Sequence, residues 1–266
     1  MSFPKIISIE GNIGAGKTTI LKNLQAYYSD NSNVVFLREP VDIWETITDK
    51  NGENILSKFY ADPSKYSFSF QVMAFVTRLS MLRQVIDTNP DCHLIICERS
   101  LEADRHIFAK MLYDDGLIDE INYKIYLHFY NEYRNDFVLD GIIYIQTDPT
   151  ICDERIKTRS RNGESGIQLD YLKKCRQYHE DWLMEIDNIL IINADENVKY
   201  DRENTNDSGN KWIDIIVEYI DDLIENEHDN VVEYSDFESD DEFDWIGMLV
   251  KSIYKQIRTL LFLRHK

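Results

Sequence analysis

One eight-residue run constrains the fold of this chain more than any other feature. Residues 11–18, Gly-Asn-Ile-Gly-Ala-Gly-Lys-Thr, match the pattern G-x-x-x-x-G-K-[ST] of a phosphate-binding loop (P-loop). The apolar run Ile6–Ile9 precedes the match, and residues 17–28 follow it with apolar side chains at helical spacing. A strand, a glycine-rich loop and a helix in this order turn backbone N–H groups toward an anion, with the positive end of the helix behind them. We therefore predict a nucleoside triphosphate site here.

The residue types of this loop have separate tasks. Glycines let the backbone curl, Lys17 can reach the β- and γ-phosphates, and Thr18 can bind Mg²⁺. The expected cofactors are ATP, or another nucleoside triphosphate donor, and Mg²⁺. We assign the donor to a continuous stretch of residues, which are Gly11, Asn12, Ile13, Gly14, Ala15, Gly16, Lys17, Thr18 and Thr19.

Short apolar runs alternate with helical segments along residues 1–224. The expected strands are Ile6–Ile9, Val34–Leu37, Leu94–Cys97, Ile142–Ile145 and Ile189–Ile192. Helical periodicity covers 17–28, 68–87, 100–113, 119–135, 169–187 and 211–224. This alternation is typical of a parallel sheet that is covered by helices on both faces. We predict an α/β protein with a P-loop kinase fold, in which a five-stranded parallel sheet is flanked by helices and binds ligands at the carboxyl ends of its strands.

Charge is unevenly distributed in this protein, which carries a net charge of −19. Residues 225–244 contain ten Asp or Glu and no Lys or Arg, whereas residues 245–266 contain five Lys or Arg and no acid. We expect a disordered acidic linker at 225–244 and a basic amphipathic helix at 245–266. That helix either docks on the protein or on a second copy, or lies on a membrane surface. The overall charge argues against binding of a nucleic acid polymer.

Cysteine usage and the N-terminus bear on the compartment. Cys92, Cys97, Cys152 and Cys175 form no C-x-x-C pair, which favours free thiols in a reducing compartment. The first residues run directly into a predicted strand and leave no room for a signal or transit peptide. The apolar stretches are far shorter than the ~18 residues that suggest a membrane span. We expect a cytoplasmic protein.

The residues after the strand Leu94–Cys97 indicate which class of P-loop protein this chain belongs to. Glu98-Arg99-Ser100 follows this strand, and no guanine-recognising N-K-x-D is present, which favours a small-molecule kinase over a GTPase. Arg99 can hold the transferring phosphoryl group, and Glu98 can support Mg²⁺ together with Thr18, directly or through water. An ordinary surface ion pair is the alternative for Glu98 and Arg99.

Several motifs in one order resemble the deoxynucleoside kinase family, most closely its deoxycytidine and deoxyguanosine kinase branch. They are Glu39-Pro40-Val41-x-x-Trp44, Phe70-Gln71, Glu98-Arg99-Ser100, Asp104-Arg105 and the basic run at 154–161. The similarity spans residues 5 to about 224. It implies ATP-dependent phosphorylation of the 5′-hydroxyl of a deoxynucleoside, in nucleotide salvage, by a homodimer.

The resemblance implies a role for each catalytic and donor-binding residue. Glu39 is the general base that accepts the 5′-hydroxyl proton; an acid that merely favours a helix N-terminus is the alternative. Arg155, Arg159 and Arg161 belong to a lid over ATP, where cations stabilise the migrating charge. A solvated basic helix is the alternative, and it suits Arg155 better than the other two arginines. The donor base is expected near Asp195, Glu196 and Asn197.

The resemblance also assigns the nucleoside pocket. Gln71, Ala74 and Arg78 share one helical stripe. By the resemblance, Gln71, Arg78 and Asp104 contact the polar edge of the base, while Ala74, Arg78 and Asp104 determine which base is accepted. The other assigned residues are Phe70 and Phe108 as stacking rings, Trp44 and Leu56 beside them, and Tyr60 and Glu164 at the sugar 3′-hydroxyl. An Arg78–Asp104 pair favours deoxycytidine or purine deoxynucleosides over thymidine; a purely structural ion pair is the alternative.

Two rival functions remain distinguishable by residue type. A nucleoside monophosphate kinase needs additional cations for the phosphate of the acceptor, whereas Glu39 suits an uncharged alcohol. A kinase-like structural subunit without turnover would lack the catalytic residues, yet Lys17, Glu39, Arg99, Arg159 and Arg161 are all present.

Overall fold

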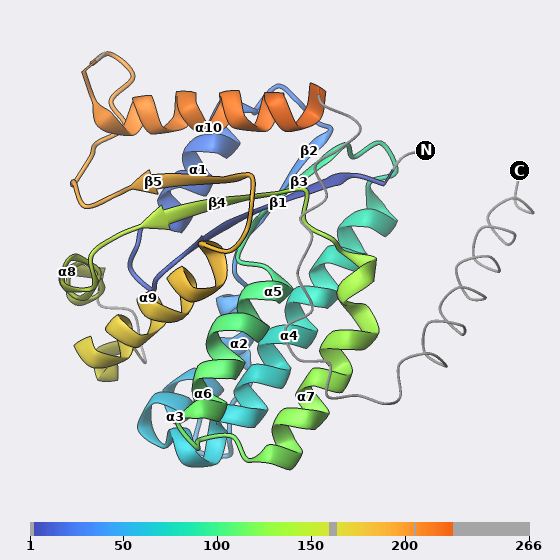
Figure 1. Ribbon diagram of the computed structural model, residues 1–266, viewed down its shortest axis with the longest axis vertical. Helices are drawn as coiled ribbons and strands as arrows, with labels where there is room; N and C mark the ends of the chain where they lie inside the picture. The colour runs from blue at the N-terminus through green and yellow to red at the C-terminus, as the bar shows by residue number, and fades with distance from the viewer. Residues whose placement is uncertain (1–2, 160–163, 205, 226–266) are drawn as a thin grey trace, which may run out of the picture. The chain divides into compact units, whose positions relative to one another are not determined.

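The computed structural model describes residues 3–159, 164–204 and 206–225. Within these residues a five-stranded, all-parallel sheet has the order β2-β3-β1-β4-β5 (Figure 1). The strands are β1 (Lys5–Gly11), β2 (Val34–Leu37), β3 (Leu94–Glu98), β4 (Gly141–Gln146) and β5 (Ile189–Asn193). The predicted α/β fold and all five predicted strands are confirmed.

Helices cover both faces of this sheet. On one face lie α1 (Lys17–Tyr27) and α10 (Ser208–Glu225), and on the other lie α4 (Pro63–Thr88), α7 (Glu120–Tyr133) and α9 (Leu169–Leu183) (Figure 1). Helix α8 (Pro149–Arg159) lies beyond the carboxyl end of β4. The shorter described elements are α2 (Val41–Thr46), α3 (Ile55–Ala61), α5 (Leu101–Ala103), the π-helix η1 (Asp104–Ala109), α6 (Lys110–Asp114) and the 3₁₀ turns η2 (Arg134–Asp136) and η3 (Glu164–Gly166).

Apolar periodicity explains how the helices attach to the sheet. On α10, Ile213, Ile216, Ile220 and Leu223 follow helical spacing and are all buried. They join the side chains of β1, β3 and β4 in one apolar cluster. Burial of these side chains stabilises the sheet and therefore gives the loops at its edge a rigid support.

The order of the strands determines where the site lies. Strand β1 lies between β3 and β4, with Ile9 beside Glu98 and Gly11 beside Ile145. The chain runs from β1 to β2 and β3 on one side of β1 and then crosses to β4 and β5 on its other side, which leaves a crevice at the carboxyl ends of the strands. The P-loop after β1, Glu39 after β2 and Arg99 after β3 all lie at this edge.

Two differences between the predicted and the observed helices lie at the edge of the sheet that bears the site. Helices α2 and α3 were not predicted, because six or seven residues are too few to show a helical period. Asn54 caps α3 by accepting a hydrogen bond from the Ser57 N–H at 2.8 Å. The single helix predicted at 100–113 is divided into α5, η1 and α6, and a π-helical turn of this kind is frequent at functional sites.

The C-terminal expectations cannot be compared with the structure. Helix α10 ends at Glu225, and the rest of the acidic segment 225–244 and the basic segment 245–266 lie outside the described residues. Among the residues that are described, no helix is both long enough and apolar enough to cross a membrane.

Candidate active site

A pocket of about 520 Å³ lies at the carboxyl edge of the sheet. It brings together most of the residues that the sequence assigned to donor, acceptor and metal. The assigned residues in its lining are Ile13, Gly14, Gly16, Lys17, Thr18, Thr19, Glu39, Trp44, Leu56, Tyr60, Phe70, Gln71, Ala74, Arg78, Glu98, Arg99, Asp104, Phe108, Arg155, Arg159 and Glu164. Those not in its lining are Gly11, Asn12, Ala15, Asp195, Glu196 and Asn197, while Arg161 lies outside the described residues.

The P-loop is shaped by backbone conformations that favour glycine. Gly14 and Gly16 have φ values of 81° and 105°. A Cβ on Gly14 would lie 2.6 Å from the carbonyl oxygen of Cys152 on α8, so the loop packs directly against that helix. Lys17 Nζ donates to the carbonyl oxygens of Gly11 (3.1 Å) and Asn12 (2.9 Å). Burial and the nearby Arg99 lower the pKa of Lys17 to about 8.

Two oxygen ligands suited to Mg²⁺ meet beside the P-loop. Thr18 Oγ1 donates to Glu98 Oε1 at 2.7 Å. In the described part of the chain, no group of three or more His, Cys, Asp or Glu side chains could hold a metal ion by itself. Magnesium commonly takes one or two protein ligands and completes its shell with water and phosphate oxygens, so Thr18 and Glu98 fit this ion.

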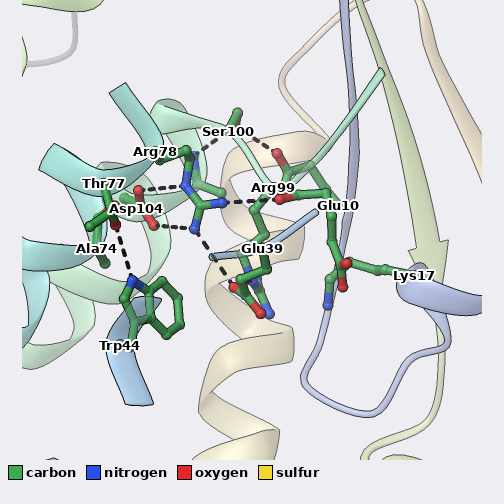
Figure 2. A network of polar contacts seen from close by, with 12 residues as sticks. Glu10, Lys17, Glu39, Trp44, Ala74, Thr77, Arg78, Arg99, Ser100 and Asp104 are labelled. Carbon is green, nitrogen blue, oxygen red and sulfur yellow. Dashed lines mark hydrogen bonds and ion pairs between the residues drawn. The ribbon is translucent and has the colours of Figure 1, made fainter. Parts of the chain in front are cut away.

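Glu39 lies among three cations at the centre of the pocket. Its Oε1 atom accepts a hydrogen bond from Arg99 Nε at 2.9 Å and lies 3.6 Å from Arg78 Nη2. Figure 2 shows Glu39 and Arg99 between the residues of α4 and Lys17. Burial acts to raise the pKa of Glu39, but Arg99, Arg78 and Lys17 outweigh it and lower the pKa to about 2. Glu39 is therefore an ionised carboxylate at neutral pH.

Arg99 is held in an unusual backbone conformation directly after β3. Its φ is 66°, in the left-handed region, and its N–H donates to the Ile9 carbonyl oxygen at 3.1 Å. The guanidinium carbon lies 4.5 Å from the centre of the Phe108 ring, and Nη1 is buried without a protein partner. Phe108 therefore supports Arg99 with its ring, in addition to lining the pocket.

Arg78 and Asp104 form a buried pair between α4 and η1. Arg78 donates to Asp104 through Nε (2.9 Å) and Nη2 (3.3 Å), and through Nη1 to the Glu98 carbonyl oxygen (3.0 Å) (Figure 2). Burial opposes the charge of Arg78, but Asp104 outweighs burial and raises the pKa of Arg78. Burial raises the pKa of Asp104, against the opposing effects of Arg78 and Arg99. The hydrogen bonds of Arg78 connect the base pocket to the end of β3, directly before Arg99.

Aromatic rings form one side of the nucleoside pocket. Phe70 stacks on Phe59 with ring centres 4.6 Å apart, and Trp44 meets Phe70 edge-on at 5.4 Å. The Trp44 indole N–H donates to Thr77 Oγ1 at 3.0 Å. Phe59 was missed because the resemblance assigned only its neighbours Leu56 and Tyr60 on α3. The other lining residues that sequence reasoning missed are Lys22, Arg38, Val41, Asp42 and Tyr171.

The lid side of the pocket contains two arginines with different surroundings. Arg159 Nη2 lies 2.5 Å from Glu164 Oε2, which places a predicted phosphate ligand beside a predicted sugar ligand. Arg155 donates to the carbonyl oxygens of Ala15, Ala194 and Glu196 and to Asn197 Oδ1. Arg155 therefore joins the P-loop to the segment 194–197, where the donor base was expected, and is not left to solvent.

Glu10 is a buried carboxyl group near the site that sequence reasoning also missed. It ends the apolar part of β1, is fully buried, and accepts a hydrogen bond from Ser100 Oγ at 2.6 Å (Figure 2). Burial raises the pKa of Glu10, against the opposing effects of Ser100 and Arg99. An acid at the end of a buried strand, directly before a P-loop, was the available signal.

The family model described as deoxynucleoside kinase matches residues 7–225, most of the chain. The chain belongs to the deoxynucleoside kinase family. A probable deoxycytidine kinase of fowlpox virus (strain NVSL) is 40% identical over 201 residues, covering 72% of this chain and 79% of the relative. Deoxycytidine kinase of Homo sapiens is 38% identical over 199 residues (68% and 75%), and mitochondrial deoxyguanosine kinase of Xenopus laevis is 31% identical over 235 residues (78% and 86%).

Membership makes this deoxynucleoside kinase a transferase with a nucleoside triphosphate donor and a deoxynucleoside acceptor. The predicted family is thus confirmed.

Proposed function

We propose that this kinase transfers the γ-phosphate of ATP to the 5′-hydroxyl of a deoxynucleoside, with Glu39 as the general base. The contact between Glu39 and Arg99 carries the proposal, because it joins a proton acceptor to a phosphate ligand between the P-loop and the nucleoside pocket. In this reaction the 5′-oxygen bonds to the γ-phosphorus and its proton passes to Glu39. The bond from the γ-phosphorus to the bridging oxygen breaks, and ADP leaves.

The low pKa of Glu39 fits this role once the donor is bound. With a pKa of about 2, Glu39 is ionised but holds a proton weakly. A triphosphate beside Lys17 and Arg99 adds negative charge, which weakens the pull of these cations on Glu39 and raises its pKa. Donor binding therefore makes Glu39 a stronger base when the acceptor needs one.

Charge stabilisation on the donor comes from several cations. Arg99 contacts Glu39, and Lys17 and Arg159 line the same pocket, with Arg159 at the end of α8. We assign Arg161 to the same lid, and Thr18 and Glu98 to Mg²⁺. When bound, this ion neutralises charge on the phosphate oxygens.

The base pocket favours deoxycytidine or purine deoxynucleosides over thymidine. Arg78 and Asp104 form a fixed, buried pair beside Gln71 and Ala74. The carboxylate of Asp104 can accept a hydrogen bond from an exocyclic amino group, which thymine lacks. The positive charge of Arg78 opposes the effect of burial on the pKa of Asp104, and its hydrogen bonds hold the carboxylate in place.

A phosphorylation assay with ATP and each of the four deoxynucleosides tests the function. We expect Glu39→Gln to lower kcat by about 100-fold or more while both KM values stay within about threefold, because only the proton acceptor is lost. Glu45→Gln is the matched control, since Glu45 is exposed and lies outside the pocket. Near-normal turnover by Glu39→Gln excludes Glu39 as the base, and a preference for a deoxynucleoside monophosphate as acceptor supports the rival kinase class.

We also propose that the kinase is a homodimer. Ile121, Ile125 and Phe129 are spaced by four residues on α7 and are 72%, 41% and 41% exposed, so they form an apolar stripe. Sedimentation of the full chain should give a dimer, and Ile125→Glu with Phe129→Glu should give a monomer. Ile215→Glu on α10 is the control, because Ile215 is similarly exposed at 44%. A monomeric wild-type protein contradicts this proposal.

A further inference from the structure

Thr77, the neighbour of Arg78 on α4, makes a contact that the proposed reaction does not use. Its Oγ1 atom accepts the Trp44 indole N–H at 3.0 Å and donates to the Met73 carbonyl oxygen at 2.8 Å. A hydroxyl has one hydrogen and two lone pairs, so the backbone bond orients Thr77 and leaves a lone pair for the indole. Trp44 is only 4% exposed, and a buried indole N–H needs an acceptor of this kind.

The segment 39–44 is tethered to α4 at both of its ends. Arg78 reaches Glu39 at one end, with 3.6 Å between Nη2 and Oε1, and Thr77 holds Trp44 at the other (Figure 2). Helix α2 within this segment has six residues, no side-chain hydrogen bond at its N-cap, and Val41 and Trp44 as its buried side chains. Its position therefore depends strongly on what holds Trp44.

The same helix that tethers the segment also faces the nucleoside base. On α4, Gln71 lies two turns and Ala74 one turn before Thr77 and Arg78, and all except Thr77 line the pocket. The placement of Trp44 against α4 thus sets the distance between the residues that recognise the base and the carboxylate at the 5′-hydroxyl.

We propose that Thr77 is a positioning residue of the acceptor site. By holding the Trp44 indole, it fixes the aromatic side of the base pocket and seats the nucleoside with its 5′-hydroxyl at Glu39. This inference rests on the proposed function and adds to it a residue that contacts neither substrate.

Thr77→Val removes the acceptor at nearly constant volume. We expect the KM for the deoxynucleoside to rise about fivefold to tenfold, because a buried donor is left unpaired, while the KM for ATP changes by less than about twofold. Thr77→Ser keeps the hydroxyl and should restore the KM. Thr88→Val is the matched control, since Thr88 bonds in the same way to the Gln84 carbonyl oxygen of α4 but is exposed and far along the helix.

The variant Trp44→Phe tests whether Thr77→Val acts through the Trp44 indole or through general damage to α4. In this background, which lacks the indole N–H, Thr77→Val should change the KM for the deoxynucleoside by less than about twofold, because coupled residues are not additive. In the wild-type protein, the Trp44 indole N–H should be protected from hydrogen exchange, with its resonance assigned through Trp44→Phe.

Each outcome decides between the inference and the proposed function. An unchanged KM in Thr77→Val, an undiminished effect in the Trp44→Phe background, an equal rise in the KM for ATP, or rapid exchange of the Trp44 indole N–H overturns the inference while the proposed function stands. A wild-type kinase that phosphorylates no deoxynucleoside overturns the proposed function, and the inference with it.

Discussion

The donor and acceptor halves of the pocket are built in different ways. The donor half is mostly backbone from one continuous stretch, residues 11–19, with glycine conformations and carbonyl contacts that give it its shape. The acceptor half takes one or a few side chains each from α2, α3, α4, η1 and η3. The donor half therefore depends on the absence of side chains, whereas the acceptor half can change specificity by exchanging them.

Of the changes that distinguish the two halves, Gly14→Ala should lower enzyme activity the most. This variant tests whether the donor half depends on its backbone conformation. Its φ of 81° is unfavourable for alanine, and the new Cβ would meet the Cys152 carbonyl oxygen at 2.6 Å. Displacement of the loop from α8 should lower kcat/KM for ATP by about 100-fold, as small misplacements of reacting groups do. Enzyme assays and thermal unfolding measure the result.

Gly52→Ala is the control for Gly14→Ala. Gly52 has a nearly equal φ of 83°, but its Cβ would meet no atom within 4 Å, and it lies outside the pocket. Equal losses of activity in both variants would show that backbone strain alone, and not the contact with α8, shapes the donor half.

Replacing Arg78 and Asp104 tests whether the acceptor half is set by side chains. Arg78→Met alone leaves Asp104 buried without its partner and should lower the free energy of unfolding by about 3–5 kcal/mol. The double variant Arg78→Met, Asp104→Ala should lose less stability, and its kcat/KM ratio for thymidine over deoxycytidine should rise by about tenfold. Urea unfolding and competition assays measure both. An unchanged substrate ranking contradicts our assignment of the base contacts.

The smallest effect that we expect is a change of kcat/KM for ATP with pH, which tests Lys17 in the donor half of the pocket. Lys17 has a pKa of about 8 in the free kinase, so its charge is lost as the pH rises through this value. The kcat/KM for ATP should fall to about half of its neutral value near pH 8, because this ratio reports the free enzyme. Bound phosphates raise the pKa of Lys17, so kcat should not fall there. If kcat fell over the same pH range, loss of the proton from Lys17 would not explain the fall in kcat/KM.

The P-loop and the sheet both leave local signals in the sequence, and the five strands predicted from these signals are confirmed. A P-loop is a contiguous motif, and buried strands such as Leu94–Glu98 are continuous apolar runs. The acceptor half was assigned only through family resemblance, since its residues are brought together by tertiary packing. Helices α2 and α3 are too short to show a helical period, so Trp44, Leu56 and Tyr60 were assigned without their helices and Phe59 was missed.

Some contacts had no signal in the sequence at all. The bond from Trp44 to Thr77 joins residues 33 positions apart, and the bond from Ser100 to Glu10 joins residues 90 positions apart. Neither Thr77 nor Glu10 belongs to a motif, and only the packing of α4 and the register of β1 with β3 bring these pairs together.

The contacts of Arg155 have a consequence for engineering. The guanidinium of Arg155 on α8 donates hydrogen bonds to the carbonyl oxygens of Ala15 in the P-loop and of Ala194 and Glu196 after β5. One side chain therefore connects three stretches that are remote in sequence, namely α8, the P-loop and the segment after β5. A lid transplanted from another enzyme would therefore need matching carbonyl oxygens in the P-loop and in the segment after β5. The three stretches should be exchanged together, and not the helix alone.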